Sequence, residues 1–279
     1  MRKATRLQVA GRDSDPVASA VQDLSKFLNQ ISLSFELTNG NVEKELKLLV
    51  AAALRGVANT ERPRYLSVRD KRLNGADVDL LALTQTDHGK WSEPAFWAEF
   101  KCNFREAGAT AVFSTATEAL AQAWRYSEKL VERDWAELKK FPKLADELRG
   151  FRQQLLGRPI YIVHFLNSKP AVECGLPEVI MKKFPKSDHP VTPRKLETYY
   201  CSEVTLENQR DKNLKKSAAD IECAIKMKGQ LDASSIIHVI AQPQLYAVVT
   251  RYRAPADRRD LVPIAALRRV RRRRAGVTG

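Results

Sequence analysis

Two segments near the beginning of the chain have apolar residues at helical spacing. In the first, Asp15 followed by Pro16 is typical of a helix N-cap with proline at the first helical position, and the pattern predicts a helix over about 16–30. The second begins near Asn41, and its apolar stripe continues to Val57. A pair of helices is therefore expected ahead of the rest of the fold.

Beyond a proline-containing break, the period of the apolar positions changes from 3.6 to 2, which is typical of strands. Three consecutive strands are predicted over 65–68, 78–83 and 95–101. Asn74-Gly75 separates the first two, and a turn-rich stretch separates the second from the third.

Helical spacing returns after the third strand. It predicts a long helix over about 114–132 and a further helix, interrupted at Pro142, that runs to about residue 148. An almost continuous apolar run at 159–166 is typical of a strand covered on both faces. The order helix, three strands, helix, strand predicts an α/β fold with a central mixed β-sheet flanked by helices.

The remaining sequence is less regular. Residues 168–230 contain several prolines and predict one helix around 213–228, whereas 236–241 and 245–253 predict a final pair of strands. Four parts are therefore expected: a flexible arm over 1–15, a core over 16–166, a C-terminal elaboration packed on the core over 167–253, and a basic tail over 254–279.

The composition is that of a folded domain with a basic extension. Of 279 residues 44% are hydrophobic, which excludes disordered, collagen-like and disulfide-rich chains. The net charge is +14, and residues 251–279, with ten Arg and two Asp, contribute +8 of it. Such a run attracts polyanions, so nucleic acid is the expected partner; an anionic membrane surface and a solubilising tail are the alternatives. The candidate nucleic-acid-binding residues are Arg268, Arg269, Arg271, Arg272, Arg273 and Arg274.

Several familiar patterns are missing from the sequence. The four cysteines form no CxxC pair and the four histidines stand apart, so neither a zinc ribbon nor a disulfide framework is indicated. The motifs GxxxxGK[ST], GxGxxG, GxSxG and HExxH do not occur. The longest strongly apolar run, 48–54, is shorter than the ~20 residues of a membrane span. We expect a cytoplasmic protein that does not enter a membrane.

Charged residues interrupt two of the predicted strands. Asp77 and Asp79 share a face of one strand and Glu99 and Lys101 share a face of the next, because side chains two apart point the same way. Such charges are costly in a covered sheet unless they pair or bind a metal. Together they can surround a divalent cation and a water molecule; an ordinary salt-bridged sheet face is the alternative.

The run over 75–83, followed by 96–101, resembles the PD-(D/E)XK nuclease superfamily, although no proline precedes the aspartate. A glutamate-bearing helix precedes this run and a helix containing Gln122 follows it. Members share a restriction-endonuclease-like core with the order helix, three strands, helix, strand. The resemblance covers about 36–166 and leaves the C-terminal extension unmatched.

The resemblance implies a role for each matching residue. Asp79 would be the metal-binding aspartate, Glu99 the second carboxylate, and Lys101 the lysine that orients or activates the attacking water. Many members add a glutamate from the preceding helix. Glu43 lies about 60° from the centre of the apolar stripe and Glu45 about 100°, at ~100° per residue, so Glu43 is the better candidate.

Two further residues are candidates for support of that site. Gln122 resembles a glutamine that some members place on the following helix, and Asp77 is a second ligand, a partner of a ligand or a turn residue. The implied activity is a Mg²⁺-dependent endodeoxyribonuclease, with Mn²⁺ as a substitute metal. The expected partner is DNA, with RNA and a homodimer left open. The alternatives are a non-cleaving nucleic-acid-binding protein on the same fold and an interaction module.

Overall fold

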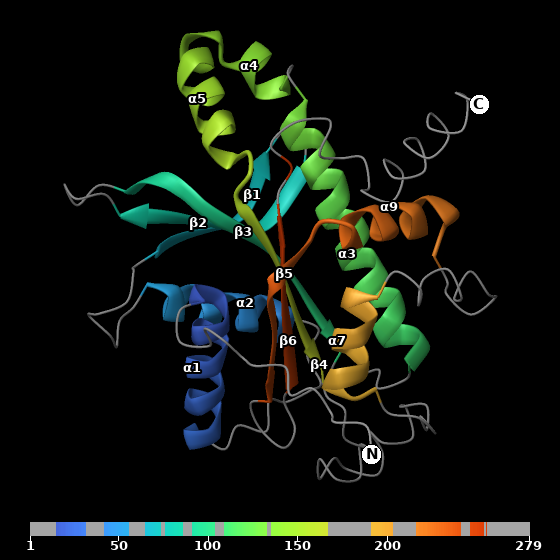
Figure 1. The fold of residues 1–279 in the computed structure, drawn as a ribbon. Coiled ribbons are helices and arrows are strands. Elements are labelled where there is room, and N and C mark those ends of the chain that lie inside the picture. The colour runs from blue at the N-terminus through green and yellow to red at the C-terminus, as the bar shows by residue number, and fades with distance from the viewer. Residues whose placement is uncertain are drawn as a thin grey trace, which may run out of the picture.

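Six strands form one open, mixed sheet with the order β1-β2-β3-β4-β6-β5, shown in Figure 1. β3 and β4 are parallel, and all other neighbours are antiparallel. The strands are β1 (Tyr65–Leu73), β2 (Ala76–Gln85), β3 (Trp91–Asn103), β4 (Pro159–Leu166), β5 (Leu231–Ile240) and β6 (Tyr246–Arg253). This computed structural model describes residues 15–31, 42–55, 65–73, 76–85, 91–103, 109–132, 135–166, 191–202, 216–240, 246–253 and 255.

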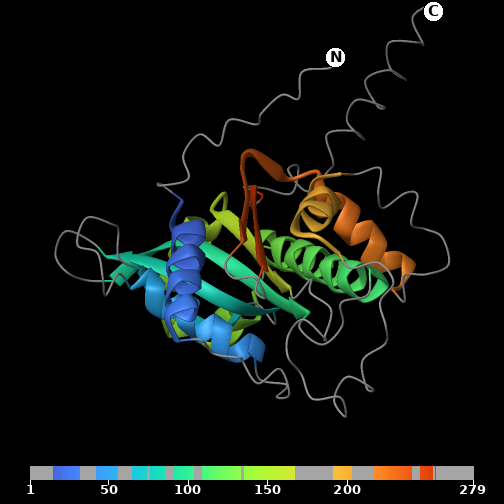
Figure 2. The ribbon, with the colours of Figure 1, turned by 90° about the horizontal axis from the view of Figure 1, so that it is seen from below.

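Helices cover both faces of the sheet, as Figures 1 and 2 show. One face is covered by α1 (Pro16–Ile31) and α2 (Val42–Leu54). The other is covered mainly by α3 (Ala109–Val131), α7 (Pro193–Cys201) and α9 (Ala218–Lys228). Between α3 and β4 the chain forms α4 (Ala136–Lys140), the short 3₁₀ helix η1 (Pro142–Leu144) and α5 (Ala145–Leu155). The predicted α/β class, with a mixed sheet between helices, is confirmed.

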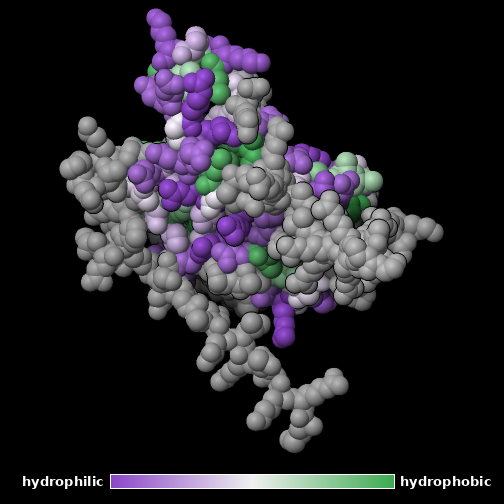
Figure 3. All heavy atoms as spheres, turned by 45° about the horizontal axis from the view of Figure 1, so that its top comes forward, coloured by the Kyte–Doolittle hydropathy of each residue, from purple (hydrophilic) through white to green (hydrophobic). Residues whose placement is uncertain are grey.

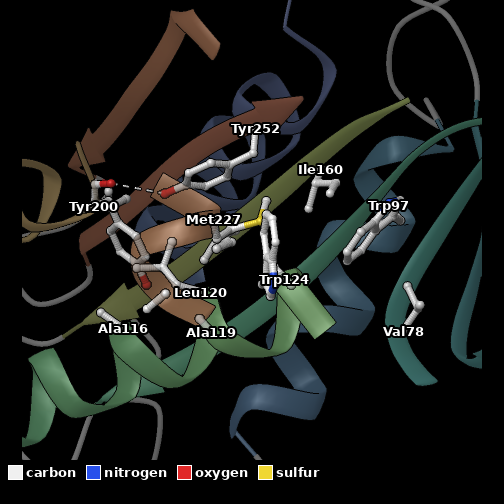
Figure 4. Close-up of a cluster of buried hydrophobic side chains, with 14 of the residues drawn as sticks. Val78, Trp97, Ala116, Ala119, Leu120, Trp124, Ile160, Tyr200, Met227 and Tyr252 are labelled. Carbon is white, nitrogen blue, oxygen red and sulfur yellow. Dashed lines mark hydrogen bonds between the residues drawn. The ribbon is translucent and has the colours of Figure 1, made fainter. Parts of the chain in front are cut away.

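The core has one apolar layer on each side of the sheet because the strands alternate their side chains. In β4, Ile160 and Ile162 pack toward α3, whereas Tyr161 and Val163 pack toward α1 and α2. This confirms that the apolar run at 159–166 is covered on both faces. The layer under α3, drawn in Figure 4, is rich in large side chains. Its members include Trp97, Leu120, Trp124, Tyr200, Met227 and Tyr252.

Most helices and strands lie where the periodicity places them, with shifted ends. The long helix starts at Ala109, before the predicted 114, and the helix expected around 213–228 starts at Ala218 after a Ser217 cap. β5 starts at Leu231 instead of 236, because pairing with β6 resumes across an irregularity between Leu231 and Ile236. The start of β5 was missed because its polar residues lack the apolar alternation of a strand.

One helix was not expected at all. α7 begins at Pro193 after Thr192, whose side chain accepts a hydrogen bond from the backbone N–H of Lys195 at 3.3 Å. The proline-rich surroundings suggested irregular structure, although Thr192-Pro193 repeats the cap-and-proline signal of Asp15-Pro16. No helix of the described ranges is long and apolar enough to cross a membrane.

Asp15 is the N-cap of α1, as predicted, and it also ties that helix to the sheet. Its Oδ1 accepts hydrogen bonds from the backbone N–H groups of Val17 and Ala18, both at 3.0 Å. Its Oδ2 accepts the hydroxyl of Tyr161 on β4 at 2.8 Å, and Nη1 of Arg251 on β6 lies 3.9 Å away. Both oxygens of one buried carboxylate are thus used to fix the first helix on its face.

Replacing Asp15 with alanine should destabilise the fold by about 2–4 kcal/mol, since it removes an N-cap and leaves the buried Tyr161 hydroxyl without its acceptor. Urea unfolding followed by circular dichroism measures the change. Asp146→Ala is the matched control, because Asp146 lies in the first turn of α5 with a side chain 97% exposed. Its free energy of unfolding should stay close to that of the wild type. Equal stability of Asp15→Ala and Asp146→Ala would contradict the prediction.

Candidate active site

β2 and β3 stop pairing with each other partway along their length. Their ladder runs from the pair Gln85 and Trp91 to the pair Leu80 and Ala98. Beyond it, the start of β2 pairs with β1 and the end of β3 pairs with β4. We call this place the strand split, defined by residues 76–79 of β2 and 99–103 of β3.

Asp79 closes the ladder at the strand split. Its Oδ2 accepts the backbone N–H of Phe100 at 2.8 Å, a bond that a β2 carbonyl would accept if the ladder continued. Its Oδ1 accepts a hydrogen bond from Nζ of Lys47 on α2 at 2.7 Å. The Asp79 side chain remains 18% exposed, so the carboxylate is both fixed and reachable.

Glu43 lies on the same face of α2 as Lys47, because the two residues are one helical turn apart. Burial raises the pKa of Glu43, and nearby Asp79 and Glu118 add to the increase, whereas Lys101 and Lys47 oppose it. The structure therefore brings Glu43 into the electrostatic neighbourhood of the strand split. Glu45, the other glutamate considered on this helix, is exposed.

Glu99 and Lys101 form an ion pair on β3, with 2.9 Å between Lys101 Nζ and Glu99 Oε1. Glu99 is only 2% exposed, and its Oε2 has no hydrogen-bond partner among the described residues. Burial raises the pKa of Glu99 to about 8 against the opposing effect of Lys101. Burial alone would lower the pKa of Lys101, but Glu99, together with Glu43 and Asp79, outweighs it and raises the pKa of this lysine.

Two residues that the sequence did not indicate complete this group. Glu118 on α3 lies with Oε1 4.0 Å from Lys101 Nζ and with Oε2 2.5 Å from Nζ of Lys216, which precedes α9. Glu118 is one turn before Gln122, so a helix face that includes Gln122 also includes Glu118. The four-residue spacing from Gln122 could have indicated Glu118 in the sequence. In the same way, the four-residue spacing from Glu43 could have indicated Lys47. No local pattern marks Lys216.

The structure gives fewer contacts for the two candidate supporting residues, Gln122 and Asp77, than for the residues above. Gln122 lies on α3, and its buried Oε1 has no hydrogen-bond partner among the described residues. Asp77 lies in β2 with its backbone opposite Arg72 of β1. The arginines of 268–274 and most of the tail lie outside the described residues.

A buried polar network lies behind Lys101, whose backbone is in register with His164 of β4. Asn103 Nδ2 donates to Thr115 Oγ1 at 3.1 Å, and that hydroxyl itself donates to a backbone carbonyl. Asn103 Oδ1 therefore accepts from His164 Nε2 at 2.6 Å, and His164 Nδ1 accepts the Tyr200 hydroxyl at 2.8 Å. Burial and the nearby Lys101 lower the pKa of His164 to about 3, so the ring is neutral, and with Nε2 as its donor Nδ1 is the acceptor of the Tyr200 hydroxyl.

The donor chemistry at the strand split suits a hard divalent cation. In the described ranges no three His, Cys, Asp or Glu side chains are grouped as ligands of one metal ion. Mg²⁺, however, commonly takes one or two protein carboxylates and completes its shell with water and phosphate oxygens. Asp79 and Glu99 can supply those two, and the unbonded, buried Oε2 of Glu99 is an oxygen with unused capacity. The residues present therefore fit Mg²⁺.

Comparison of the chain with protein-family models, with curated protein sequences and with solved structures found no match.

Glu99→Gln should change how the stability of the metal-free protein depends on pH. The folded pKa of about 8 exceeds the ordinary value of 4.5, so between these values the native state holds a proton that the unfolded state has released. The free energy of unfolding should fall as pH rises through this window, and Glu99→Gln should remove that part of the fall. Urea unfolding in EDTA at a series of pH values measures it.

The control for this prediction is Glu45→Gln, which changes an exposed glutamate and should retain the pH dependence of the wild type. The prediction fails if the curves of wild type and Glu99→Gln remain parallel across the window.

Proposed function

We propose that this protein is a Mg²⁺-dependent nuclease with a restriction-endonuclease-like core that hydrolyses phosphodiester bonds in DNA. The observation that carries the proposal is the meeting of Asp79, Glu99 and Lys101 at the strand split. Three charged residues from two strands are held beside one another where a sheet would ordinarily be apolar. Burial of these charges costs free energy, and charges kept in spite of such a cost are typical of functional sites. A bound cation and phosphate would interact favourably with them.

Each carboxylate has a distinct part in the proposed site. Asp79 is fixed by the Phe100 N–H and presents Oδ1, the atom now bonded to Lys47, to the cation. Glu99 presents Oε2, while its Oε1 keeps Lys101 beside the same point. Glu43 adds negative charge from α2. When bound, Mg²⁺ supplies neutralisation of phosphate charge and a more acidic water.

Lys101 acts in this proposal as a hydrogen-bond donor. Its raised pKa keeps the ammonium charged at neutral pH, so it can orient a water molecule or a phosphate oxygen but does not remove a proton. Its place is set by the pair with Glu99 and by the packed network of His164 behind it. A fixed ammonium costs little reorganisation when charge develops on the phosphate.

The order of elements gives independent support for the proposed core. The segment from α2 through β1, β2, β3 and α3 to β4 has the order helix, three strands, helix, strand of the resembling superfamily, with α4, η1 and α5 inserted between α3 and β4. The charged residues also lie on the matching elements, with Glu43 on α2, Asp79 on β2, and Glu99 with Lys101 on β3.

Purified protein should cut plasmid and linear DNA in the presence of Mg²⁺ or Mn²⁺, and EDTA should abolish cutting. Asp79→Asn and Lys101→Ala should each lower the rate at least ~100-fold, because they remove electrostatic or proton-positioning contributions. Gel analysis of the products over time measures the rates. Glu43→Gln should also reduce cutting, whereas Glu45→Gln on the same helix should not. Metal-dependent cutting that survives Asp79→Asn would refute the site.

One observation favours a second function, a nucleic-acid-binding protein that does not cut. Lys47 already pairs with Asp79 and Lys101 with Glu99 Oε1, so the charges at the strand split also have partners within the protein. If this second function is correct, the protein should bind DNA in a salt-sensitive way and should not cleave it with any metal. Both functions predict DNA binding, so only the cutting assay distinguishes them.

Removal of residues 268–279, which contain six arginines, should weaken DNA binding under either function. If each arginine contacts a phosphate, the slope of log affinity against log salt should fall by up to ~5. Fluorescence anisotropy with a labelled duplex across a salt series gives both slopes. An unchanged slope would mean that the tail does not contact the duplex.

A further inference from the structure

The chain between α3 and β4 forms a helical hairpin that stands away from the sheet, at the top of Figure 1. We call residues 139–144, where α4 ends and η1 turns the chain into α5, the hairpin tip. In Figure 3 the protruding lobe is mostly hydrophilic, with hydrophobic side chains between the polar ones.

The hairpin tip exposes two large apolar side chains. Phe141 is 45% exposed and Leu144 is 49% exposed. Among the residues whose side-chain burial the structure describes, the one other exposed large hydrophobic residue is Leu48, at 46%, on α2. Two of these three thus lie three residues apart at one turn, each with about half of its surface in contact with solvent.

The same tip is basic. Lys139, Lys140 and Lys143 are all exposed, and residues 138–145 contain no acidic side chain. Lys140 Nζ lies 5.4 Å from the centre of the Phe141 ring, so charge and apolar surface are presented together. Lysines that neutralise phosphates, beside an apolar side chain that enters a groove or a base step, are a combination that suits duplex DNA.

The base of the hairpin is held firmly to the end of α3. The guanidinium of Arg152 on α5 donates hydrogen bonds to the backbone carbonyls of Leu130, Val131 and Glu132 at 2.9–3.2 Å. Trp135, just before α4, is 1% exposed and packs in the layer under α3. The tip is therefore a projection with a fixed direction relative to α3.

α3 also connects the tip to the candidate active site. Glu118 lies beside Lys101, and Val131 ends the helix at the base of the hairpin. At 1.5 Å per residue these positions are separated by ~20 Å along the helix axis, and the tip projects beyond the second of them. The distance to the base of the hairpin alone corresponds to ~6 base-pair steps of duplex DNA, at 3.4 Å per step along each strand.

We propose that the hairpin tip is a second contact for duplex DNA held at the strand split, with its lysines on phosphates and Phe141 and Leu144 against a groove. This inference rests on the proposed function for its substrate. The basic charge of the hairpin tip complements the phosphate backbone. Membrane binding scales with the apolar area that is buried, and two side chains bury too little for it. Insertion of a side chain into a DNA groove or base step needs no more apolar area than these two side chains offer.

Binding of a labelled 30-base-pair duplex, measured by anisotropy in EDTA with the full chain, tests the lysines. Lys140→Gln combined with Lys143→Gln should lower the salt slope by ~2, at ~0.9 per phosphate contact. The matched control is Lys44→Gln combined with Arg55→Gln, which removes two exposed charges at α2 on the other face of the sheet. The control should retain the slope of the wild type.

The apolar contact is tested separately. Phe141→Ala combined with Leu144→Ala should weaken binding about tenfold with little change in the salt slope, because no charge is removed. Leu48→Ala is the control for loss of an exposed apolar side chain elsewhere. Thermal unfolding of each variant should match the wild type, since all the altered side chains are exposed.

The outcomes separate this inference from the proposed function. If the wild type binds DNA and both tip variants bind it equally well, the tip is not a contact, whereas metal-dependent cutting still decides the nuclease. If the wild type binds but does not cut, the tip inference stands on the binding data alone. A wild type that does not bind DNA overturns the tip inference, whereas the cutting assay with Mg²⁺ still decides the proposed function. A tip whose variants lose binding only to phosphatidylserine vesicles is a membrane contact, which overturns the DNA proposal.

Discussion

The separation of β2 from β3 is the constraint on which the rest of the site depends. A sheet that divides leaves backbone groups without their ladder partners, and burying such groups unpaired is costly. The Asp79 carboxylate takes the Phe100 N–H, so the division is stabilised by the same residue that the proposed chemistry needs. Side chains from α2 and α3 can then meet those of the two strands, because no continuous ladder stands between them.

Charge balance follows from that opening. Four carboxylates, Glu43, Asp79, Glu99 and Glu118, face three ammonium groups, Lys47, Lys101 and Lys216. Burial makes the charges of Glu99, Lys47 and Lys101 expensive by themselves, and pairing offsets much of the cost. A cation placed among the carboxylates would compete with the lysines, chiefly with Lys47 for Asp79 Oδ1.

Local patterns predicted the parts of this protein that depend on local physics. The cap at Asp15, the strand at 159–166 and the nearness of Asp79 to Glu99 follow from capping, from periodicity and from the pairing of consecutive strands. The choice of Glu43 over Glu45 followed from helical geometry. Lys47, Glu118 and Lys216 were not predicted, since a charged residue in a helical or irregular stretch resembles one on a solvated surface until its tertiary neighbours are known.

The position of β6 in the sheet has a consequence for how the chain folds. β4 is almost wholly apolar, and its second neighbour is β6, which comes some 80 residues later in the sequence. During synthesis β4 therefore remains an unpaired edge until β6 has been made, and such edges invite association with other chains. The segment that resembles a complete nuclease core is thus not expected to be a self-sufficient folding unit. Contacts between distant parts of the sequence should make folding slow, and chaperone binding while β4 is exposed would protect the nascent protein.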